Sequence, residues 1–416
     1  MRILLVNPNR YHYPPVIPVG LEYLCGELSK SVHKPIIVDL CFSKNPEKDL
    51  ISAINETNPD IAGISIRHID TVLFQDNRFF IDEIKQYVTI CRNMNLKVIL
   101  GGVGFSIMPE EILKYTGADF GISGAGEIAL TRLLDQIEKG EDCAKLTDGF
   151  SFFSGTSYEF SRAKVLDYSE YINNDGIVGF RTQTGCTDRC FFCTEGGMQI
   201  IYSNPESVGR EIYGLKQRGY SSFHLCDSEF NLNLQHCTDV CRAIIEYAGP
   251  VNWTLYMKPE PYSEDLFMWL GKSGANLITL SIDTKTSQSD SFSRLAEFFR
   301  LAESSNIKIA IDLSVGYPYE DPGETVKMIE FLDKQPLETV GINSWYRVYP
   351  GTPLHKIVTG DRSLEKYMVN FTPGTDFLLP VFFNYFSVQQ VSEWIEKYPK
   401  FRIEGFDMNT NYQRVR

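Results

Sequence analysis

The sequence predicts an α/β fold in which two parallel β-sheets follow one another along the chain. Residues 1–140 alternate short runs of β-forming residues with stretches whose apolar residues recur at helical spacing. A second alternating series begins near residue 176, after a polar and hydroxyl-rich segment. Strands that alternate with helices at this pitch are joined by right-handed crossovers, so each sheet should be parallel. In such sheets ligands bind at the carboxyl ends of the strands.

The first series predicts a doubly wound sheet with helices between its strands. The strands are expected at residues 2–6, 35–40, 60–66, 97–100 and 118–122. The helices are expected at residues 19–31, 47–57, 82–94, 109–115 and 128–138. This domain should end near residue 140, and residues 141–175 are expected to form an irregular linker because they are polar and rich in hydroxyl side chains.

The second series fits a partial (β/α)6 barrel over residues 176–360, because roughly 180 residues are too few for eight units. Its strands are expected at residues 177–182, 222–226, 251–256, 277–282, 309–315 and 340–348. Its helices are expected at residues 205–218, 234–247, 263–273, 290–304 and 322–334. Residues 361–416 should form a short C-terminal segment in which aromatic side chains pack together.

The composition indicates a folded globular protein and excludes several function classes. Apolar residues make up 43% of the chain, and 40 Lys and Arg against 53 Asp and Glu give a net charge of −13. This charge argues against nucleic acid or anionic membrane as a partner, because both are held mainly by basic residues. No stretch approaches 18 uncharged apolar residues, and no secretory signal precedes the first strand. We therefore expect a soluble cytoplasmic protein.

The most informative motif is a cysteine triplet in the segment GFRTQTGCTDRCFFCTEGG. Cys186, Cys190 and Cys193 are separated by three and two residues, directly after the first strand of the second series. Three thiolates on one loop can hold a 4Fe-4S cluster and leave one iron free of cysteine. A zinc site would need a fourth ligand, for which Cys226 or His224 could serve. The spacing and the strand-end position favour the cluster.

At these residues the chain resembles the radical S-adenosylmethionine superfamily, whose loop has the pattern Cys-x-x-x-Cys-x-x-Cys. The resemblance covers approximately residues 175–360. It implies a 4Fe-4S cluster whose open iron binds the amino and carboxylate groups of S-adenosylmethionine. It also implies a one-electron reductant such as ferredoxin or flavodoxin, which starts the cleavage to a 5′-deoxyadenosyl radical.

The resemblance suggests further contacts to S-adenosylmethionine at the ends of later barrel strands. The methionyl amine is assigned to the acidic run CDSE, the carboxylate to a lysine, and the ribose to a Ser or Asp in LSIDT. The candidates are Asp227, Ser228, Glu229, Lys258, Ser281 and Asp283. Each of them could instead be a solvated strand end, a helix cap or part of the barrel packing.

Four segments of the first 140 residues resemble the cobalamin-binding, Rossmann-like domain that precedes the radical core in one subclass. They are LVNPNRYHYPPVIPVGLEYLCGEL, DIAGISIRHID, VILGGVGFSIMPEEIL and GISGAGEIAL. Glycines there could let the backbone approach a bulky ligand, and a helix that begins after them could face it. The candidates are Gly101, Gly102, Gly104, Ser123, Gly124, Gly126 and Glu127. The same glycines could simply form tight turns.

The environment below the cobalt is predicted to lack a protein ligand. The pattern Asp-x-His-x-x-Gly is absent, and His12 has neither the preceding Asp nor the following Gly. In related enzymes without this pattern, a residue just after the third strand approaches the lower cobalt face, which points here to Arg67 or His68. A cationic Arg67 would not coordinate cobalt. Alternatively, Arg67 forms a surface salt bridge and His68 a structural hydrogen bond.

The resemblance implies a cobalamin-dependent methyltransferase that acts on an sp3 carbon. The 5′-deoxyadenosyl radical would abstract a hydrogen, the carbon radical would take methyl from methylcobalamin, and a second S-adenosylmethionine would remethylate cob(I)alamin. Tyr346 and Tyr349 lie at the end of the sixth strand and could line the substrate pocket or supply a proton. Only residues 361–416 follow the barrel, so its mouth should stay open.

An open mouth suits a peptide or protein substrate, as in the glutamine C-methyltransferase that acts on methyl-coenzyme M reductase. Small-molecule methyltransferases share the same motifs. Two other classes remain open: a radical enzyme that performs non-methylation chemistry on a small molecule with a cofactor-free scaffold domain, and a non-catalytic iron-sulfur protein. A second metal site at Cys237 and Cys241 is less favoured than helix packing, because no other ligands accompany them.

Overall fold

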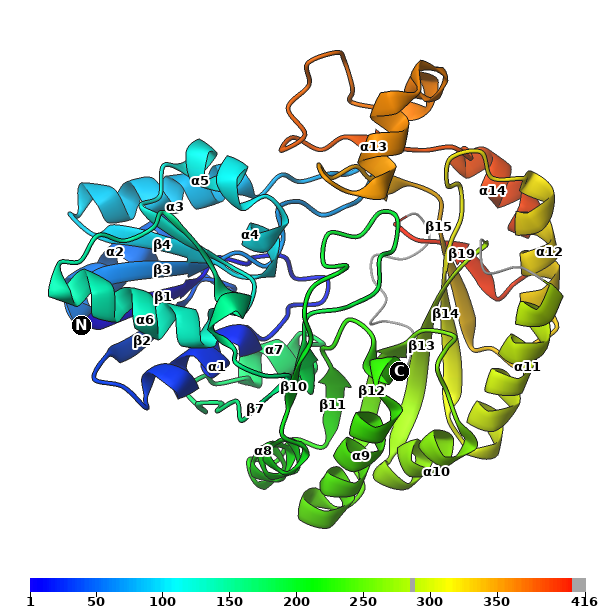
Figure 1. Ribbon diagram of the computed structural model, residues 1–416, viewed down its shortest axis with the longest axis horizontal. Coiled ribbons are helices and arrows are strands. Elements are labelled where there is room, and N and C mark those ends of the chain that lie inside the picture. The colour runs from blue at the N-terminus through cyan, green and yellow to red at the C-terminus, as the bar shows by residue number, and fades with distance from the viewer. Residues whose placement is uncertain (285–288, 406–416) are drawn as a thin grey trace. The chain divides into compact units, whose positions relative to one another are not determined.

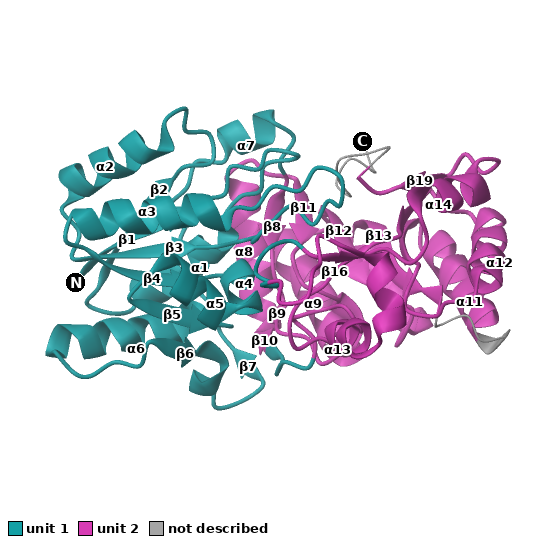
Figure 2. Cartoon of the chain, turned by 90° about the horizontal axis from the view of Figure 1, so that it is seen from above, with its two compact units in different colours: residues 1–176, 197–201, 376–380 teal, residues 177–196, 202–375, 381–416 magenta. Residues whose placement is uncertain are grey.

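The computed structural model describes residues 1–284 and 289–405 and divides the chain into two compact units (Figure 2). Unit 1 comprises residues 1–176, 197–201 and 376–380. Unit 2 comprises residues 177–196, 202–375 and the chain from residue 381. Each unit is built around a parallel sheet of its own, as the alternating sequence pattern predicts.

Unit 1 contains a six-stranded parallel sheet in the order β2-β1-β3-β4-β5-β6. Its strands are β1 (Arg2–Asn7), β2 (Lys34–Asp39), β3 (Ile61–Ser65), β4 (Lys97–Gly101), β5 (Phe120–Ser123) and β6 (Leu146–Asp148). The first five confirm the expected strands. The sixth lies inside the segment expected to be irregular, where it extends the sheet beyond β5. Three residues with no clear alternation are too short a pattern to be recognised as a strand.

The helices of unit 1 lie on both faces of this sheet (Figure 1). They are α1 (Val19–Leu28), α2 (Pro46–Thr57), α3 (Ile81–Asn93), α4 (Val103–Ile107), α5 (Pro109–Thr116), α6 (Gly126–Lys139) and α7 (Ser169–Asn173). Helices α1 and α6 pack together on one face, and α3 packs with α2 and α5. Local signals explain where α2 begins, since Asn45 accepts a hydrogen bond from the Lys48 amide and Pro46 occupies the first turn.

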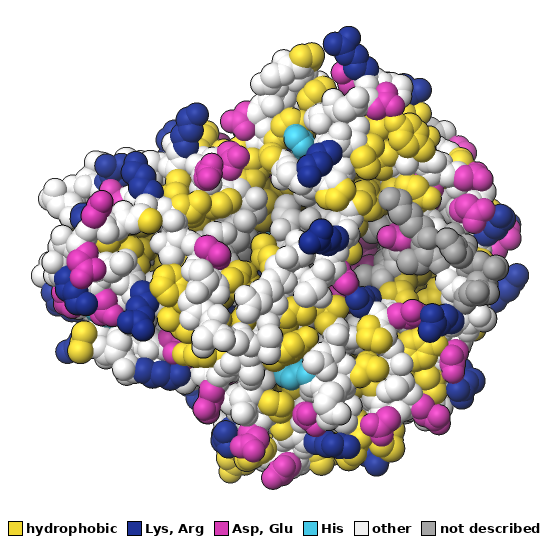
Figure 3. Space-filling view, viewed as in Figure 1, with side chains coloured by type: hydrophobic (Ala, Val, Ile, Leu, Met, Phe, Trp, Pro, Cys, Tyr) yellow, Lys and Arg dark blue, Asp and Glu magenta, His cyan; other side chains and the backbone are white. Residues whose placement is uncertain are grey.

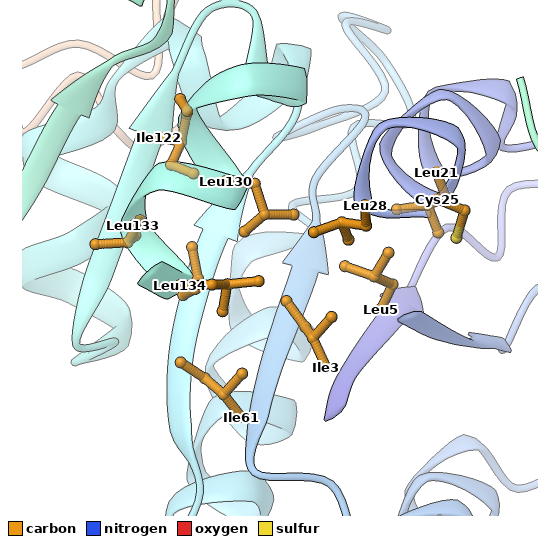
Figure 4. Close-up of a cluster of buried hydrophobic side chains, with 12 residues drawn as sticks. Ile3, Leu5, Leu21, Cys25, Leu28, Ile61, Ile122, Leu130, Leu133 and Leu134 are labelled. Atoms are coloured by element: carbon orange, nitrogen blue, oxygen red, sulfur yellow. The ribbon is translucent and has the colours of Figure 1, made fainter. Parts of the chain in front are cut away.

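The core of unit 1 is an aliphatic cluster between the sheet and the pair α1 and α6 (Figure 4). Ile3 and Leu5 on β1 and Ile61 on β3 point into it, and Leu21 on α1 and Leu134 on α6 meet them. All five side chains are buried. Each contributes about 1.5–3 kcal/mol by leaving water, so the cluster stabilises the packing of α1 and α6 on the sheet.

Unit 2 contains a seven-stranded parallel sheet in the order β19-β15-β14-β13-β12-β11-β8. Its strands are β8 (Val178–Phe180), β11 (Ser222–Leu225), β12 (Asn252–Met257), β13 (Ala275–Asp283), β14 (Lys308–Ser314), β15 (Thr339–Asn343) and β19 (Phe401–Ile403). The first six confirm the partial barrel. The seventh comes from the C-terminal segment and pairs in parallel with β15.

Helices line the outer side of this curved sheet (Figure 1). They are α8 (Pro205–Gln217), α9 (Leu234–Ala248), α10 (Glu264–Ser273), α11 (Ser289–Ser304) and α12 (Pro322–Asp333). Strand β12 illustrates the resulting alternation, because Trp253, Leu255 and Met257 are buried whereas Thr254 and Tyr256 are only half-buried. The inner side of the barrel therefore carries the polar residues.

The expected sixth strand at 340–348 is interrupted after Asn343. Tyr346 and Arg347 form β16 (Tyr346–Arg347), which leaves the parallel sheet and joins the antiparallel sheet β16-β18-β17. The other two strands are β17 (Met368–Val369) and β18 (Phe382–Phe383). Helices α13 (Pro353–Gly360) and α14 (Val388–Ile395) complete this region. The C-terminal segment thus places a small sheet directly after β15, at the end of the barrel that was expected to stay open.

The remaining elements are short. They are η1 (Gly149–Phe152), β7 (Ser157–Tyr158), β9 (Gln183–Thr184), β10 (Ile201–Ser203), η2 (Phe230–Leu232) and η4 (Arg362–Tyr367). Of the C-terminal aromatic residues, Phe382, Phe383 and Phe386 are buried, which confirms the expected packing.

Acidic and basic side chains are interspersed over the face shown in Figure 3. Within the described residues, no helix is both long enough and apolar enough to cross a bilayer.

Candidate active site

A pocket opens at the carboxyl ends of the strands of unit 1. Its empty space, including the part open to solvent, is about 390 Å³. Its lining is apolar apart from Ser65 and backbone groups. The lining residues are Leu5, Leu21, Leu24, Gly63, Ile64, Ser65, Ile99, Leu100, Gly101, Gly102, Ile122, Gly126 and Leu130. Gly101, Gly102 and Gly126 were among the predicted cofactor contacts, and they do line this pocket.

The glycines after β4 also shape the loop after β3. Gly102 has a φ of 96°, and a Cβ there would come within 2.5 Å of the Ile66 carbonyl oxygen. A Cβ on Gly104 would come within 2.8 Å of the Arg67 carbonyl carbon and of the His68 amide nitrogen. The Gly104 amide donates to the Ile66 carbonyl at 2.9 Å. Only glycine permits this close approach, so the motif GGVG fixes the segment that carries Arg67.

Arg67 and His68 lie together at this position. Arg67 is half-buried and His68 is exposed, and the Nε of Arg67 donates to His68 Nε2 at 2.8 Å. The surrounding protein atoms and the charge of Arg67 lower the pKa of His68 below its ordinary value. The imidazole is therefore neutral near pH 7, which agrees with its role as hydrogen-bond acceptor. This geometry provides a cation beside a neutral imidazole whose Nε2 lone pair is already engaged.

The other predicted contacts follow β5. Ser123 ends the strand, and Gly124, with a φ of 80°, packs so closely on Phe150 that a Cβ would lie 2.5 Å from the ring. The Gly124 amide donates to the Ser106 hydroxyl at 2.8 Å. Glu127 is buried in the first turn of α6. Gly124 therefore serves the internal packing of this loop, whereas Gly126 faces the pocket.

The cysteine loop of unit 2 follows β9 and is closed by a bridge between Cys186 and Gly196. The Cys193 amide donates to the Cys190 carbonyl at 3.1 Å, which makes a tight turn between these two cysteines. Cys186 is buried, Cys193 is half-buried and Cys190 is exposed. The three thiols of the loop therefore differ in exposure, from the buried Cys186 to the exposed Cys190.

The thiols influence one another electrostatically. Desolvation, together with the charges of Cys193, Asp188 and Cys186, raises the pKa of Cys190 to about 11. The pKa values of Cys186 and Cys193 are also raised, chiefly by burial. The neighbouring backbone of the loop opposes this rise, since the backbone at Asp188 lowers the pKa of Cys186 and the backbone at Glu195 and Gly196 lowers that of Cys193.

These observations allow a test of whether the loop fits an iron-sulfur cluster. Within the described residues, no three His, Cys, Asp or Glu side chains stand in an arrangement that would already hold a metal ion. The donor chemistry nevertheless fits, since three thiols share one loop and amide hydrogen bonds to the sulfurs are a feature of cluster sites.

Glu229 is the most unusual polar residue beside this loop. It is half-buried after β11, and its Oε2 is buried without a hydrogen-bond partner. Desolvation raises its pKa to about 8, a hydrogen bond with Ser281 lowers it, and the charges of Asp188 and Lys258 act in opposite directions. A buried acceptor without a donor is costly, so Glu229 fits a ligand that brings a cation or an N–H group. The structure thus brings together Glu229, Lys258 and Ser281.

Asp227 and Ser228, from the same acidic run, face other partners. The Asp227 carboxylate accepts hydrogen bonds from the amides of Thr182 at 2.8 Å and Gln183 at 3.2 Å, and from the Thr182 hydroxyl. Desolvation raises its pKa to about 6. Ser228 is exposed and donates to Glu195 at 3.0 Å. Asp227 therefore braces the strand that leads into the cysteine loop, and its assignment to the methionyl amine remains a prediction.

Lys258 is tied to the cysteine loop. Its Nζ donates to both carboxylate oxygens of Asp188, at 2.8 and 2.7 Å. Lys258 was expected to hold a ligand carboxylate, and no role was expected for Asp188 between the first two cysteines. The pattern CTDRC contained the signal, because a charged residue inside a ligand loop needs a partner. Asp283 ends β13, where it is half-buried and its charge acts on Tyr346.

Tyr346 is buried, and its hydroxyl has no hydrogen-bond partner. Its ring packs on Phe191 and Phe192 of the cysteine loop, with centroids 4.9 and 5.3 Å apart. Burial raises its pKa well above the ordinary value, which argues against easy proton release. Tyr349 is half-buried, and the Arg347 guanidinium lies 4.9 Å from its ring centroid. The catalytic roles of Tyr346 and Tyr349 stay predictions.

A buried carboxylate at the same end of the barrel, Glu320, was not predicted from the sequence. Glu320 is 2% exposed and accepts hydrogen bonds from the Thr284 and Thr325 hydroxyls and from the Gly316 and Tyr317 amides. It therefore holds the loop after β14 to the end of β13. A Glu in the turn GYPYED gives no sequence signal for such a role, because its partners are distant along the chain.

The zinc alternative gains no support. Cys226 is exposed, and His224 Nδ1 forms a hydrogen bond with the Thr254 hydroxyl at 2.8 Å. Cys237 and Cys241 are fully buried in α9, as helix packing predicts.

Comparisons with known proteins agree with this architecture. Residues 12–134 match the B12 binding domain family. The chain is 23% identical over 357 residues to the tryptophan 2-C-methyltransferase of Streptomyces laurentii, covering 68% of this chain and 59% of that protein. This chain thus spans less than two thirds of the length of that relative.

Two solved structures share the fold. The radical S-adenosylmethionine methyltransferase TsrM from Kitasatospora setae superimposes with a TM-score of 0.79 at 24% identity, over 86% of this chain and 76% of that one. The cobalamin-dependent S-adenosylmethionine radical enzyme OxsB gives a TM-score of 0.71 at 15% identity, over 95% of this chain and 66% of that one.

The chain therefore has the fold of the cobalamin-dependent radical S-adenosylmethionine enzymes, with a region that matches the B12 binding domain at its N-terminal side. This confirms the predicted resemblance and fold class. The glutamine-specific subtype is not confirmed by these comparisons.

Proposed function

We propose that this protein is a cobalamin-dependent radical S-adenosylmethionine methyltransferase that transfers a methyl group to a carbon of a small molecule. The observation that carries the proposal is the convergence of the cysteine loop with Glu229, Lys258 and Ser281 at one end of the barrel. The B12-binding region and the shared fold support the same conclusion.

Cys186, Cys190 and Cys193 would hold a 4Fe-4S cluster. Bound there, the cluster would supply one electron to S-adenosylmethionine, delivered by a reductant such as ferredoxin or flavodoxin. The loop residues would do the positioning, because the backbone at Asp188, Glu195 and Gly196 favours the thiolate forms of Cys186 and Cys193. Backbone hydrogen bonds to sulfur stabilise thiolates and raise the potential of a cluster.

Glu229 would accept the ammonium group of S-adenosylmethionine. Its unpartnered Oε2 needs a donor, and an ammonium supplies both the hydrogen bond and the opposite charge. Ser281, in contact with Glu229, would orient that carboxylate. Asp283, at the next inward-facing position of β13, would meet the ribose hydroxyls.

The pocket of unit 1 would hold an apolar part of the corrinoid, because Ser65 is its single polar side chain among the lining residues. Arg67 would face the metal without coordinating it, since a guanidinium has no lone pair to donate at neutral pH. The glycines around Arg67 fix its backbone. The protein's contribution would be to orient the corrinoid and to keep a donor away from its lower face.

We propose a small aromatic acceptor in place of the peptide that the sequence suggested. We expected a peptide substrate because the barrel mouth was expected to be open. The sheet β16-β18-β17 follows β15 directly, which argues against a fully open mouth. Half-buried Phe192 and Tyr317 offer ring faces near Tyr346. The likeness to a tryptophan methyltransferase makes tryptophan the first compound to test. A cytoplasmic location and the division into domains at residues 140, 176 and 360 stay predictions.

The decisive experiment is anaerobic reconstitution with iron, sulfide, S-adenosylmethionine and cobalamin, followed by mass spectrometry. We expect corrinoid and cluster absorbance in the purified protein and a methylated product from tryptophan or a related indole. Recovery of 5′-deoxyadenosine in step with the product would support hydrogen abstraction, and its absence with methylated product would indicate polar methyl transfer. Methylation of a glutamine-containing peptide alone would overturn the small-molecule acceptor. Failure to bind either cofactor would overturn the whole proposal.

A further inference from the structure

The ion pair between Lys258 and Asp188 joins two parts of unit 2 that are 70 residues apart in sequence. Lys258 directly follows β12, and Asp188 lies between Cys186 and Cys190. The two contacts of Nζ, at 2.8 and 2.7 Å, make the pair bidentate. The side chains are 25% and 30% exposed, so water screens the pair only in part.

The lysine end of this pair is rigid. The Lys258 amide donates to Asn231 Oδ1 at 3.0 Å, and Asn231 Nδ2 donates to the Lys258 carbonyl at 2.9 Å and to the Pro261 carbonyl at 2.7 Å. Asn231 is fully buried. A side chain that satisfies the backbone of Lys258 on both sides holds it in one place, so Lys258 extends from a fixed point.

The aspartate end is coupled to the first cysteine. Cys186 forms a β-bridge with Gly196, and this bridge closes the cysteine loop. A Cβ on Gly196 would come within 2.6 Å of the Asp188 carbonyl oxygen, so the backbone there has little room to move. The position of Asp188 is therefore tied to the bridge that holds Cys186.

We propose that the pair Asp188–Lys258 is a clamp that positions the cysteine loop for the cluster. The proposal rests on the proposed function only in taking Cys186, Cys190 and Cys193 as the cluster ligands. Lys258 acts through Asp188 and not on a reacting atom, so it is a positioning residue. A ligand carboxylate that approached Lys258 would have to share it with Asp188.

The experiment measures cluster assembly in the absence of S-adenosylmethionine. Lys258→Met and Asp188→Asn each remove the attraction, Lys258→Arg keeps it, and the double exchange Asp188→Lys with Lys258→Asp restores it with reversed sign. Lys308→Met is the matched control, because Lys308 pairs with Glu338 at 3.2 Å at the amino end of β14, away from the cysteine loop. The readouts are iron and sulfide per chain and the electron paramagnetic resonance spectrum of the reduced cluster.

We expect the two neutralising variants to bind the cluster about three- to fivefold more weakly and to show altered g-values, since a partly exposed pair contributes up to about fivefold in an equilibrium. Lys258→Arg and the double exchange should recover most of the loss, and Lys308→Met should match the wild type. Circular dichroism checks that all variants remain folded.

Wild-type loading and an unchanged spectrum in folded Lys258→Met and Asp188→Asn would overturn the clamp. Equal loss in the single variants and in the double exchange would also overturn it, because a loss independent of pairing is not a clamp. A wild-type protein that takes up no cluster would overturn the proposed function itself, which is a distinguishable result.

Discussion

The two parallel sheets end in chemically opposite ways. At the carboxyl edge of the unit 1 sheet, the pocket is lined by Leu, Ile and Gly with Ser65 as its polar side chain. At the same edge of the unit 2 sheet stand Glu229, Lys258 and Asp283, with Asp188 facing them from the cysteine loop. The topology that delivers a ligand to the strand ends is the same in both.

The difference teaches that topology selects the place and side chains select the ligand. An apolar rim favours a large ligand that gives up little hydration when it binds, and a charged rim favours a zwitterion and a metal cluster. Substitutions at each edge should therefore affect one cofactor and spare the other, which makes the comparison open to measurement.

The largest effect is expected at the cysteine loop. Cys190→Ala should abolish cluster absorbance near roughly 400 nm and the cleavage of S-adenosylmethionine, because one iron of the cluster would lose its cysteine ligand. Cobalamin content should be unchanged. Cys237→Ala is the control, since Cys237 is buried in α9 and should leave both measurements largely intact. Full production of 5′-deoxyadenosine by Cys190→Ala would contradict the ligand assignment.

The next effect is expected at the charged rim. Glu229→Gln keeps the shape of the side chain and removes its charge, so S-adenosylmethionine should bind about 10- to 100-fold more weakly to the cluster-loaded protein. Equilibrium dialysis measures this loss. Glu206→Gln, in an exposed pair with Arg210, should bind like the wild type. Unchanged affinity in Glu229→Gln would remove this carboxylate from the site.

A smaller effect is expected at the apolar pocket, where a substitution should reduce cobalamin content and spare the cluster. A Cβ on Gly101 would have its nearest neighbour at 3.6 Å, so the backbone tolerates a side chain while Val would fill part of the pocket. Gly101→Val should lower cobalamin content about tenfold and leave the cluster intact. Gly20→Ala, where a Cβ meets nothing within 4 Å, is the control. Normal corrinoid loading in Gly101→Val would place the cofactor elsewhere.

The smallest effect is expected at His68. Its Nε2 accepts from Arg67, so bound cob(II)alamin should show no nitrogen hyperfine splitting from the protein in electron paramagnetic resonance. His68→Ala should keep that spectrum and weaken cobalamin binding by about two- to tenfold through a less well-held Arg67. A splitting in the wild type that vanishes in His68→Ala would show that the histidine coordinates cobalt.

Much of the fold was readable from periodicity, and the errors have a common cause. The long amphipathic helices and the buried strands of both sheets follow from alternation over many residues. Strands β6 and β19 have three residues each, and their role comes from the strand beside which they lie. The antiparallel sheet at β16 escaped prediction for the same reason, because its partners are distant in sequence.

The sequence by itself determined the chemistry that comes from residues close together along the chain. Three thiols within eight residues and glycine runs after strands are local patterns, so Cys186, Cys190 and Cys193 and the pocket glycines could be named in advance. The tertiary structure alone decided which polar side chains meet. Asp188 with Lys258, Glu229 with Ser281, and Glu320 with Thr284 are each separated by more than 30 residues. Pairing at that range depends on strand order and on burial, neither of which a linear pattern encodes.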